Sequence, residues 1–392
     1  MNDVVIVEAV RTPIGHRNGG LASVHATDLL AHVQRGVLER AGIDPGDVDQ
    51  VVGGCVGQVG MQAMNVTRNA WLAAGLPLEV PASTVDAQCG SAQQATNLAF
   101  ALVRAGLAEV AIGCGVEVMS AVPMGSTVPR DSGVGRPITR TYWAHHEFTS
   151  QFEGAERIAD RWGISRAECD AFGKASQDRA ARAWAEGRFD SQVLPVDVPE
   201  RDADGNPTDR STTVARDEGP RETTLEGLAA LKPTGRPDGV HTAGTSSQIA
   251  DGAAAVLLMT REKAAALGLT PRATIVDSCL VGCDPVLMLE GPIPATRRLL
   301  GDHGLSVSDI DVVEINEAFA SVVLAWQREF APDPATVNPN GGAIALGHPL
   351  GGTGAVLLTK ALHELERTDA EHAIVTMCCG GGLGTGTLLR RG

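Results

Sequence analysis

The stretch Ser83-Thr-Val-Asp-Ala-Gln-Cys-Gly-Ser-Ala-Gln-Gln-Ala95 decides how the chain is organised. Residues 80–85 predict a short buried strand, and small and apolar residues recur at helical spacing from Ala92 onward. Cys89 lies at the corner between these two elements. Because the start of a helix offers unpaired N–H groups and a positive dipole end, we expect a lowered pKa for this thiol. The stretch therefore indicates a nucleophile at Cys89, with a buried structural cysteine as the alternative.

The composition favours an acidic, globular protein that is soluble and cytoplasmic. The 392 residues carry a formal net charge of −15, and 43% of them are hydrophobic. This length predicts two or three lobes, and the negative charge disfavours nucleic acid as a partner. The N-terminus lacks a signal-like apolar run, and no stretch is long and apolar enough for a membrane helix. We therefore expect no nucleic-acid and no membrane partner.

The eight cysteines do not form a recognisable framework. They include no C-x-x-C pair, and with the scattered histidines they do not reproduce a zinc spacing. A disulfide scaffold is also not expected in a chain of this length. The sequence thus predicts neither a disulfide framework nor a metal site.

The chain contains an apparent internal repeat. Segments 41–52 and 303–314 match at five positions, and each follows a predicted helix and leads into a predicted strand. Cys89 and His348 then follow at similar distances, each in a loop that feeds a helix. The pattern predicts a duplicated α/β half within a layered α/β architecture, with coincidence as the alternative.

A different kind of region separates the two halves. Residues 119–248 are more charged, and residues 152–162 and 166–184 predict helices. An insertion of this kind is a usual place for substrate and cofactor contacts. We therefore divide the chain into an N-terminal half (1–118 plus 249–270), an inserted loop domain (119–248) and a C-terminal half (271–392).

Four segments carry reactive residue types: Cys89-Gly-Ser91, Asn316-Glu-Ala-Phe319, Gly341-Gly-Ala-Ile-Ala-Leu-Gly-His-Pro-Leu-Gly351 and Cys378-Cys-Gly-Gly-Gly-Leu-Gly384. Singly, each has a plain explanation, such as a helix cap at Asn316 or a carbonyl contact at His348. The last segment lies too near the C-terminus for a dinucleotide-binding loop. As a set, and over essentially the whole chain, they resemble the thiolase family. The resemblance implies a thiolase-like α/β fold, in which two duplicated halves form a layered αβαβα core with an inserted loop domain.

The resemblance also implies an acyltransferase that splits a 3-oxoacyl-CoA by ping-pong chemistry. In the family, the histidine that matches His348 activates the cysteine that matches Cys89. The same imidazole, with a water held by the asparagine that matches Asn316, stabilises the enolate oxygen. The N–H groups of Cys89 and Gly380 are expected to form a second oxyanion hole.

A second cysteine handles the proton on carbon in this family. Cys378 fits the C-x-G-G-G pattern and is expected to protonate the acetyl-CoA carbanion, or to deprotonate acetyl-CoA in the reverse direction. Its neighbour Cys379 is expected to be a packing residue.

Coenzyme A is expected as a co-substrate, without a permanently bound cofactor. The resemblance points to Arg221 for the nucleotide phosphates, where a solvated loop arginine is the alternative, and to Ser247 for the pantetheine. Met288 and Phe319 match residues that line the acyl and pantetheine channel, with apolar core as the alternative. The partners are thus acyl-CoA and CoA, and the family implies a homodimer or homotetramer.

Three stretches, 150–159, 241–250 and 314–323, resemble actinobacterial thiolases of steroid side-chain degradation. They suggest a bulky acyl group, with ordinary fatty acyl chains as the alternative. Ala92 departs from the glycine of many thiolases and is expected to alter the acyl pocket. Two further readings remain open: a biosynthetic acetoacetyl-CoA thiolase, which would use the same residues, and a non-catalytic scaffold subunit, which would have lost one of them.

Overall fold

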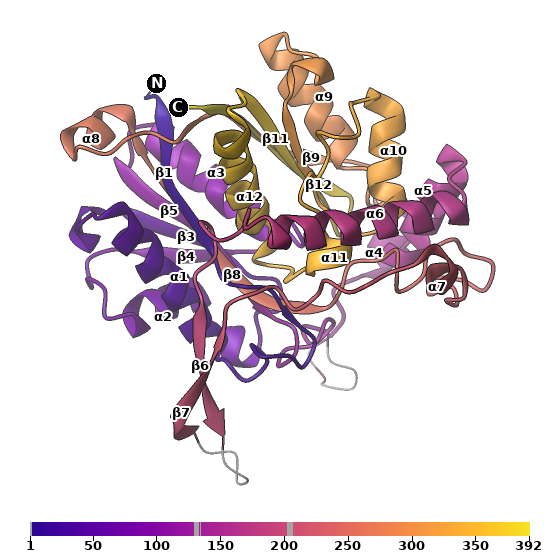
Figure 1. The fold of residues 1–392 in the computed structure, drawn as a ribbon, viewed down its shortest axis with the longest axis horizontal. Coiled ribbons are helices and arrows are strands. Elements are labelled where there is room, and N and C mark those ends of the chain that lie inside the picture. Colours follow the sequence, from indigo (N-terminus) through magenta and orange to yellow (C-terminus); the bar gives the residue numbers. More distant parts are fainter. Residues whose placement is uncertain (1, 129–132, 134, 202–206) are drawn as a thin grey trace.

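The computed structural model describes residues 2–128, 133, 135–201 and 207–392 (Figure 1). The strands are β1 (Val4–Arg11), β2 (Gly15–His16), β3 (Gln50–Gly54), β4 (Ala82–Val85), β5 (Val110–Val118), β6 (Val196–Arg201), β7 (Pro207–Val214), β8 (Ala250–Thr260), β9 (Ala273–Gly282), β10 (Val312–Ile315), β11 (His372–Cys379) and β12 (Leu383–Arg391). The helices are α1 (Ala26–Ala41), α2 (Val66–Ala73), α3 (Ser91–Arg104), α4 (Arg140–Trp143), α5 (Gln151–Trp162), α6 (Arg166–Ala185), α7 (Leu225–Ala229), α8 (Arg261–Ala266), α9 (Pro292–His303), α10 (Ala320–Phe330), α11 (Ala343–Leu346) and α12 (Thr353–Thr368). Short 3₁₀ turns are η1 (Pro45–Asp47), η2 (Gly60–Gln62) and η3 (Val307–Asp309). No helix in this described part is long and apolar enough to cross a membrane.

Two halves of similar topology share one hydrogen-bonded sheet. Among the described residues its strand order is β10-β11-β12-β9-β1-β8-β5-β3-β4, with β2 beside β8. In the first half β3 is parallel to β4 and β5, and β5 is antiparallel to β8. In the second half β10 is parallel to β11, and β11 is antiparallel to β12. A short antiparallel contact between β1 and β9, at Val5 and Ile6, joins the halves.

The matched turns of the two halves have the same geometry, which confirms the predicted duplication. Gly42 and Gly304 both end a helix in the left-handed region, with φ of 68° and 64°. Glycine suits this position because a side chain would be strained there. Downstream, the carboxylate of Asp49 accepts two backbone N–H bonds at the start of β5, and that of Asp311 accepts two before β11.

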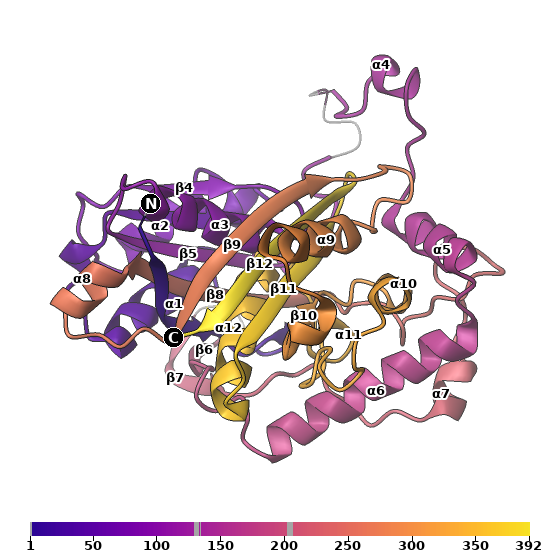
Figure 2. The same cartoon turned by 90° about the horizontal axis from the view of Figure 1, so that it is seen from above.

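The core is layered, as the resemblance implied. Helices α3 and α12 lie in the middle of the molecule, with strands of both halves around them (Figures 1 and 2). Helix α12 contacts β8 and β1 of the first half and β10 and β11 of the second. Its residues from Thr353 to Leu365 are all buried, which fits a helix covered on every side. The outer helix α1 packs on β1, β5 and β8, and α9 packs on β9, β11 and β12.

The predicted strand before Cys89 is exposed rather than buried. It is β4, the last strand of the sheet, and its residues are intermediate or exposed. Among the described residues β3 is its only neighbouring strand, so one of its edges pairs with no strand, although the Asn65 amide donates to Ala82 O at 2.9 Å.

The region between the halves leaves the main sheet. The two predicted helices are confirmed as α5 and α6. Within the described part of the chain, β6 and β7 form a separate two-stranded sheet. Figure 2 shows α4 projecting away from the core and α5, α6 and α7 lying along the side that holds α10 and α11. The division of the chain into three domains stays a prediction.

Candidate active site

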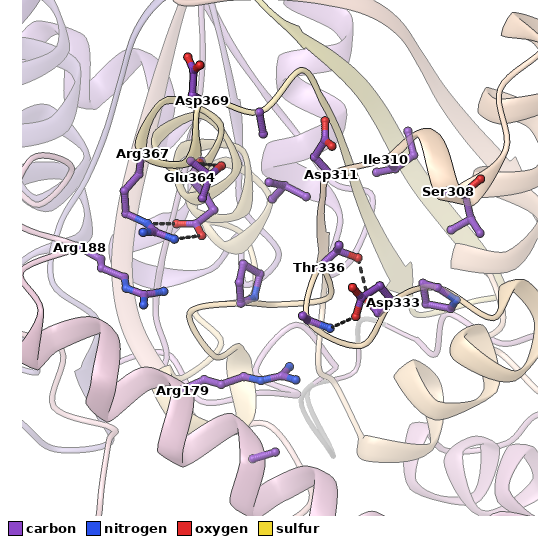
Figure 3. Close-up of a pocket in the computed structure, with 18 of the residues that line it drawn as sticks. Arg179, Arg188, Ser308, Ile310, Asp311, Asp333, Thr336, Glu364, Arg367 and Asp369 are labelled. Carbon is purple, nitrogen blue, oxygen red and sulfur yellow. Dashed lines mark hydrogen bonds and ion pairs between the residues drawn. The ribbon is translucent and has the colours of Figure 1, made fainter.

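One cavity, of about 1140 Å³, contains none of the expected site residues (Figure 3). It lies between α6, the loop before Asn340 and the C-terminal end of α12. Most of its arginines are engaged within the protein: Arg367 binds Glu364, Arg179 donates to backbone carbonyls, and Arg188 donates to the Asn340 side chain. These contacts indicate a structural role for the charged groups of this cavity.

A second cavity, of about 540 Å³, gathers residues from both halves and from the insertion. Five of the expected site residues line it: Cys89, Arg221, Ser247, Phe319 and His348. Cys89 comes from the corner before α3, Phe319 from the start of α10, and His348 from the loop between α11 and α12. Arg221 and Ser247 come from the loops that flank α7. The fold thus brings a thiol, an imidazole and a guanidinium to one opening.

The corner that carries Cys89 is held in a specific backbone geometry. Gln88 has a φ of 53°, which is uncommon for a residue with a side chain. The Ser91 hydroxyl bridges the turn, accepting from Ala87 N at 2.9 Å and donating to Gln88 O at 2.6 Å. At Gly90, an added Cβ would lie 2.6 Å from the Cys379 sulfur. Unusual backbone conformations concentrate at functional sites, and this turn aims Cys89 at the cavity.

The expected lowering of the Cys89 pKa is wrong. Burial raises the pKa of Cys89 to about 11, because an anionic sulfur would lose its hydration. The N–H groups of Gly380 and of Cys89 itself oppose this rise, whereas the carboxylates of Glu117 and Asp86 add to it. Cys89 precedes the cap residue Gly90, so the helix start does not offset the burial. Near pH 7 the Cys89 side chain is therefore a thiol, and a base would have to remove its proton before the sulfur could act as a nucleophile.

His348 lines the same cavity and has the hydrogen-bond partners expected of such a base. Its Nδ1 lies 2.6 Å from the Thr353 hydroxyl oxygen, and this hydroxyl donates to Pro349 O at 2.9 Å. A hydroxyl proton used on Pro349 O leaves the Thr353 oxygen as an acceptor, which favours the tautomer with the proton on Nδ1. Burial also lowers the pKa of His348 to about 4, so the ring is neutral near pH 7. In this tautomer Nε2 is an acceptor, and it pairs with Asn316 Nδ2 at 3.4 Å.

A buried carboxylate anchors the loop that carries His348. Glu117 accepts from Gly351 N at 2.9 Å, and from Val56 N and Gly57 N at 3.0 and 2.9 Å. Gln62 Nε2 adds a bond of 2.6 Å. Glu117 thus fastens the His348 loop to the segment after β3.

The two adjacent thiols of β11 point to opposite faces of the strand, as successive strand residues do. Cys378 packs in the apolar cluster that contains Phe319, whereas Cys379 packs in the central cluster and beneath Gly90. Burial raises the pKa of both thiols, and the nearby Cys89 sulfur adds to each rise. The cluster of Cys378 contains the cavity-lining Phe319, and the cluster of Cys379 contains Cys89. Neither thiol lines the cavity itself, so the choice of Cys378 for the proton transfer stays a prediction.

Two expected contributors to the cavity lie elsewhere. Met288 is buried beside Gly154 of α5 and does not line the cavity. The methyl group of Ala92 faces the strands, since a Cβ on Gly115 of β5 would lie 2.6 Å from the Ala92 Cβ. The added methyl therefore tightens helix–sheet packing instead of shaping the acyl pocket. In the described part of the chain, no group of acidic, histidine and cysteine side chains is arranged to hold a metal.

Sequence reasoning missed Thr353, Glu117 and the cavity-lining Arg17. A carboxylate inside the apolar strand Val116-Glu-Val118 was a signal, because acidic residues are rarely buried without partners. Thr353 offered a weaker one, as a polar residue at the start of the helix after the histidine loop. Arg17 offered none, since nothing in the sequence places residues 16–17 beside Cys89.

Comparisons with known proteins agree with this geometry. The family model described as "Thiolase, N-terminal domain" matches residues 4–262, and "Thiolase, C-terminal domain" matches residues 269–391. The chain is 46% identical to the steroid 3-ketoacyl-CoA thiolase FadA6 of Mycobacterium tuberculosis, over 100% of this chain and 95% of that protein. It is 43% identical to a beta-ketoadipyl-CoA thiolase of Acinetobacter baylyi, over the full length of both. The crystal structure of the Bacillus anthracis acetyl-CoA acetyltransferase matches with a TM-score of 0.91 at 37% identity, over 100% of this chain and 99% of the other. The chain belongs to the thiolase family.

Proposed function

We propose that this enzyme cleaves a 3-oxoacyl-CoA with coenzyme A, giving acetyl-CoA or propionyl-CoA and a shortened acyl-CoA. One observation carries the proposal: the Cys89 thiol and the neutral imidazole of His348, whose Nε2 pairs with the Asn316 amide, open onto the same cavity. The relatives include proteins named as 3-ketoacyl-CoA thiolases and acetyl-CoA acetyltransferases, which are acyltransferases. CoA acts as a co-substrate, and no resident cofactor is needed for this chemistry.

In the first half-reaction His348 Nε2 takes the proton of Cys89, and the sulfur attacks C3 of the substrate. With a thiol pKa of about 11 and an imidazole pKa of about 4, we expect proton transfer to accompany attack instead of preceding it. The C2–C3 bond then breaks, and its electron pair becomes the enolate of the departing acetyl-CoA. The imidazole and Asn316 stabilise the enolate oxygen, and Cys378 delivers a proton to C2.

In the second half-reaction the acyl group, held as a thioester on Cys89, passes to CoA. The sulfur of CoA gives its proton to the Cys378 thiolate left by the first half-reaction and attacks the thioester carbonyl, while the N–H groups of Cys89 and Gly380 stabilise the oxygen that becomes negative. The Cys89 sulfur then leaves and takes back its proton from His348, and the shortened acyl-CoA departs. In the same proposal Arg221 contacts the CoA phosphates and Ser247 the pantetheine, both at the mouth of the cavity.

We propose a bulky acyl group for the substrate. Much of the cavity lining is apolar, including Met119, Met124, Phe152, Phe319 and Leu350. Each buried methylene contributes about 0.8 kcal/mol, so a large acyl group gains over an acetyl group if the gain is kept in the transition state. The named substrates of the relatives differ, from steroid to beta-ketoadipyl, which leaves ordinary fatty acyl chains as the alternative.

Turnover against a substrate panel tests the proposal. We expect kcat/KM to rise from acetoacetyl-CoA to a medium-chain and then to a ring-bearing 3-oxoacyl-CoA. Equal or better use of acetoacetyl-CoA would contradict the bulky substrate and favour the biosynthetic alternative. Absence of thiolysis with every substrate, together with no alkylation of Cys89 by iodoacetamide that acyl-CoA can block, would favour a non-catalytic subunit.

We also propose a homodimer or homotetramer in the cytoplasm. The free edge of β4 lies near exposed apolar side chains, with Met64 87% and Leu78 71% exposed. An open strand edge beside apolar surface is suited to pairing with a second copy. All eight cysteines are free, as is usual in a reducing compartment. Light scattering after size exclusion measures the mass of the particle. The mass of a single chain, 40.7 kDa, at every protein concentration tested would contradict the proposal.

A further inference from the structure

The side chain of Gln248 lies between two segments that are far apart in the sequence. It lines the cavity beside Ser247 and is half-buried. One of its neighbours is the loop that contains Arg221, and the other is the short helix α11, which leads through Gly347 to His348. A single side chain thus contacts both the arginine proposed for the CoA phosphates and the helix that precedes the proposed base.

Gln248 holds the His348 loop through its backbone and through its amide. Gln248 O accepts from His348 N at 3.0 Å. Gln248 Nε2 lies 2.9 Å from both Ile344 O and Ala345 O, which are carbonyls of α11. The last carbonyls of a helix have no partner within the helix, so the Gln248 amide supplies one from outside. The position of α11, and of the histidine that follows it, therefore depends on this amide.

The same amide joins α11 to the loop before Arg221. Gln248 Nε2 also lies 3.1 Å from Gly219 O, and Gln248 Oε1 accepts from Arg221 Nη1 at 3.3 Å. The backbones of the two segments are packed together, since a Cβ on Gly219 would lie 2.4 Å from Ala345 O. The buried side chain of Gln177 forms a second bridge, because it accepts from Arg221 N at 3.0 Å and donates to a carbonyl of α11 at 3.3 Å.

The partner of the Arg221 guanidinium is neutral. Its hydrogen bond goes to the Gln248 amide, and among the described residues it forms no ion pair. None of the described residues that line the cavity is acidic. A carboxylate at this place would compete with a phosphate for the guanidinium, whereas an amide oxygen directs the group and leaves its charge available.

We infer that Gln248 is a positioning residue, which fixes the Arg221 guanidinium and the His348 loop relative to each other. In the proposed reaction Arg221 holds CoA at its phosphates while the CoA thiol reacts at Cys89, beside His348. Gln248 sets the spacing between these two ends through its hydrogen bonds and takes no part in bond making. The inference rests on the proposed thiolase function and on the proposed phosphate contact of Arg221.

The experiment measures deacylation of Cys89 by two thiols that differ in their phosphates. The acyl-enzyme is formed with 3-oxohexanoyl-CoA, separated from CoA esters by gel filtration, and mixed with CoA or with pantetheine. Pantetheine carries the same thiol arm as CoA but lacks the nucleotide and its phosphates. Loss of the acyl group is followed by mass spectrometry, which gives a rate constant per acylated Cys89. Protein that has not folded is not acylated and does not contribute.

Gln248→Met keeps the length of the side chain but removes the amide. We expect deacylation by pantetheine to slow about fivefold, because the His348 loop is less firmly held. Deacylation by CoA should slow by about a further fivefold, because Arg221 is no longer directed. Arg221→Gln should slow the reaction with CoA alone. In the double variant, the loss specific to CoA should equal that of Arg221→Gln, because Gln248 acts on the phosphates only through Arg221.

A matched control is Gln34→Met, which removes a buried amide from α1 outside the cavity, where it donates to Thr67 O at 3.2 Å. Both rates should stay at the wild-type level in this variant. Unchanged rates in Gln248→Met, an equal loss with the two thiols, or an added loss specific to CoA in the double variant would overturn the inference.

A second substitution covers the case in which Gln248→Met does not fold. Gln248→Glu keeps the shape of the side chain but loses the N–H donors to α11, so it should slow deacylation by pantetheine, and an unchanged rate would overturn the inference. A wild-type rate with CoA in Arg221→Gln would overturn it too, while leaving the thiolase chemistry intact. Failure of the thiolase function itself is distinguishable, because the wild type would then form no acyl-enzyme.

Discussion

Replacing Thr353 with valine keeps the shape of the side chain but removes the hydroxyl that orients His348. The buried Nδ1–H then loses its acceptor at 2.6 Å, and the neutral ring can place its proton on Nε2, where it cannot act as a base. An unpaired buried donor costs about 1–3 kcal/mol, which corresponds to roughly a five- to 150-fold fall in kcat/KM. Thr353→Ser restores an oxygen at the same place and should recover most of the rate.

The assay is the initial rate of thiolysis at varied 3-oxoacyl-CoA and CoA. Thr359→Val is a matched control, because Thr359 is buried in the same helix and its hydroxyl donates to Ala355 O at 2.8 Å, away from His348. It should lose stability on thermal unfolding but keep its kcat/KM once folded. The orienting role would be refuted if Thr353→Val stayed within twofold of the wild type, or if Thr353→Ser were as impaired as Thr353→Val.

Three further predictions concern the same cavity. Cys378→Ala should lose cleavage of the 3-oxoacyl-CoA and α-proton exchange of acetyl-CoA, yet Cys89 should still be acylated by a suitable thioester. If Cys379→Ala behaves in this way and Cys378→Ala does not, the proton transfer belongs to Cys379. Removing one oxyanion donor typically lowers kcat by a factor of about 10²–10³, so we expect a fall of that size in Asn316→Ala. The fall should be larger in His348→Ala, because this variant also loses the base. The opposite ranking of kcat in steady-state kinetics would refute the role of His348 as both base and oxyanion donor. Because burial lowers the pKa of His348 to about 4, the rate of acylation should stay level as pH falls from 7 to about 5 and drop only towards 4, whereas a midpoint near 6.5 would show a solvated imidazole.

The sequence was sufficient where local patterns determine structure. The repeat predicted a helix before each of the segments 41–52 and 303–314, and α1 and α9 end there at Gly42 and Gly304, because the signals that end a helix act within a few residues. The recurrence of Asp49 and Asp311 then reflected a shared long-range contact, in which each carboxylate accepts backbone N–H bonds at the start of the neighbouring parallel strand, β5 or β11. The layered fold followed from this repetition together with the family resemblance.

The sequence was insufficient where the outcome depends on distant parts of the chain. Whether the Cys89 thiol is activated by the helix start or penalised by burial depends on segments that meet only in the fold, such as Gly380 and Glu117. The same holds for Ala92, whose methyl group could be placed only once Gly115 of the neighbouring strand was known. Motifs identified which residue types react, but packing decided their protonation and their neighbours.

The covalent role of Cys89 is the central claim, and trapping the acyl-enzyme tests it most directly. The protein is incubated with a 3-oxoacyl-CoA in the absence of free CoA, quenched in acid, digested and analysed by mass spectrometry. We predict one added acyl group on the peptide that contains Cys89, its removal by CoA, and neither adduct nor turnover in Cys89→Ala. An adduct on another cysteine, or turnover near the wild-type level in Cys89→Ala, would contradict the account.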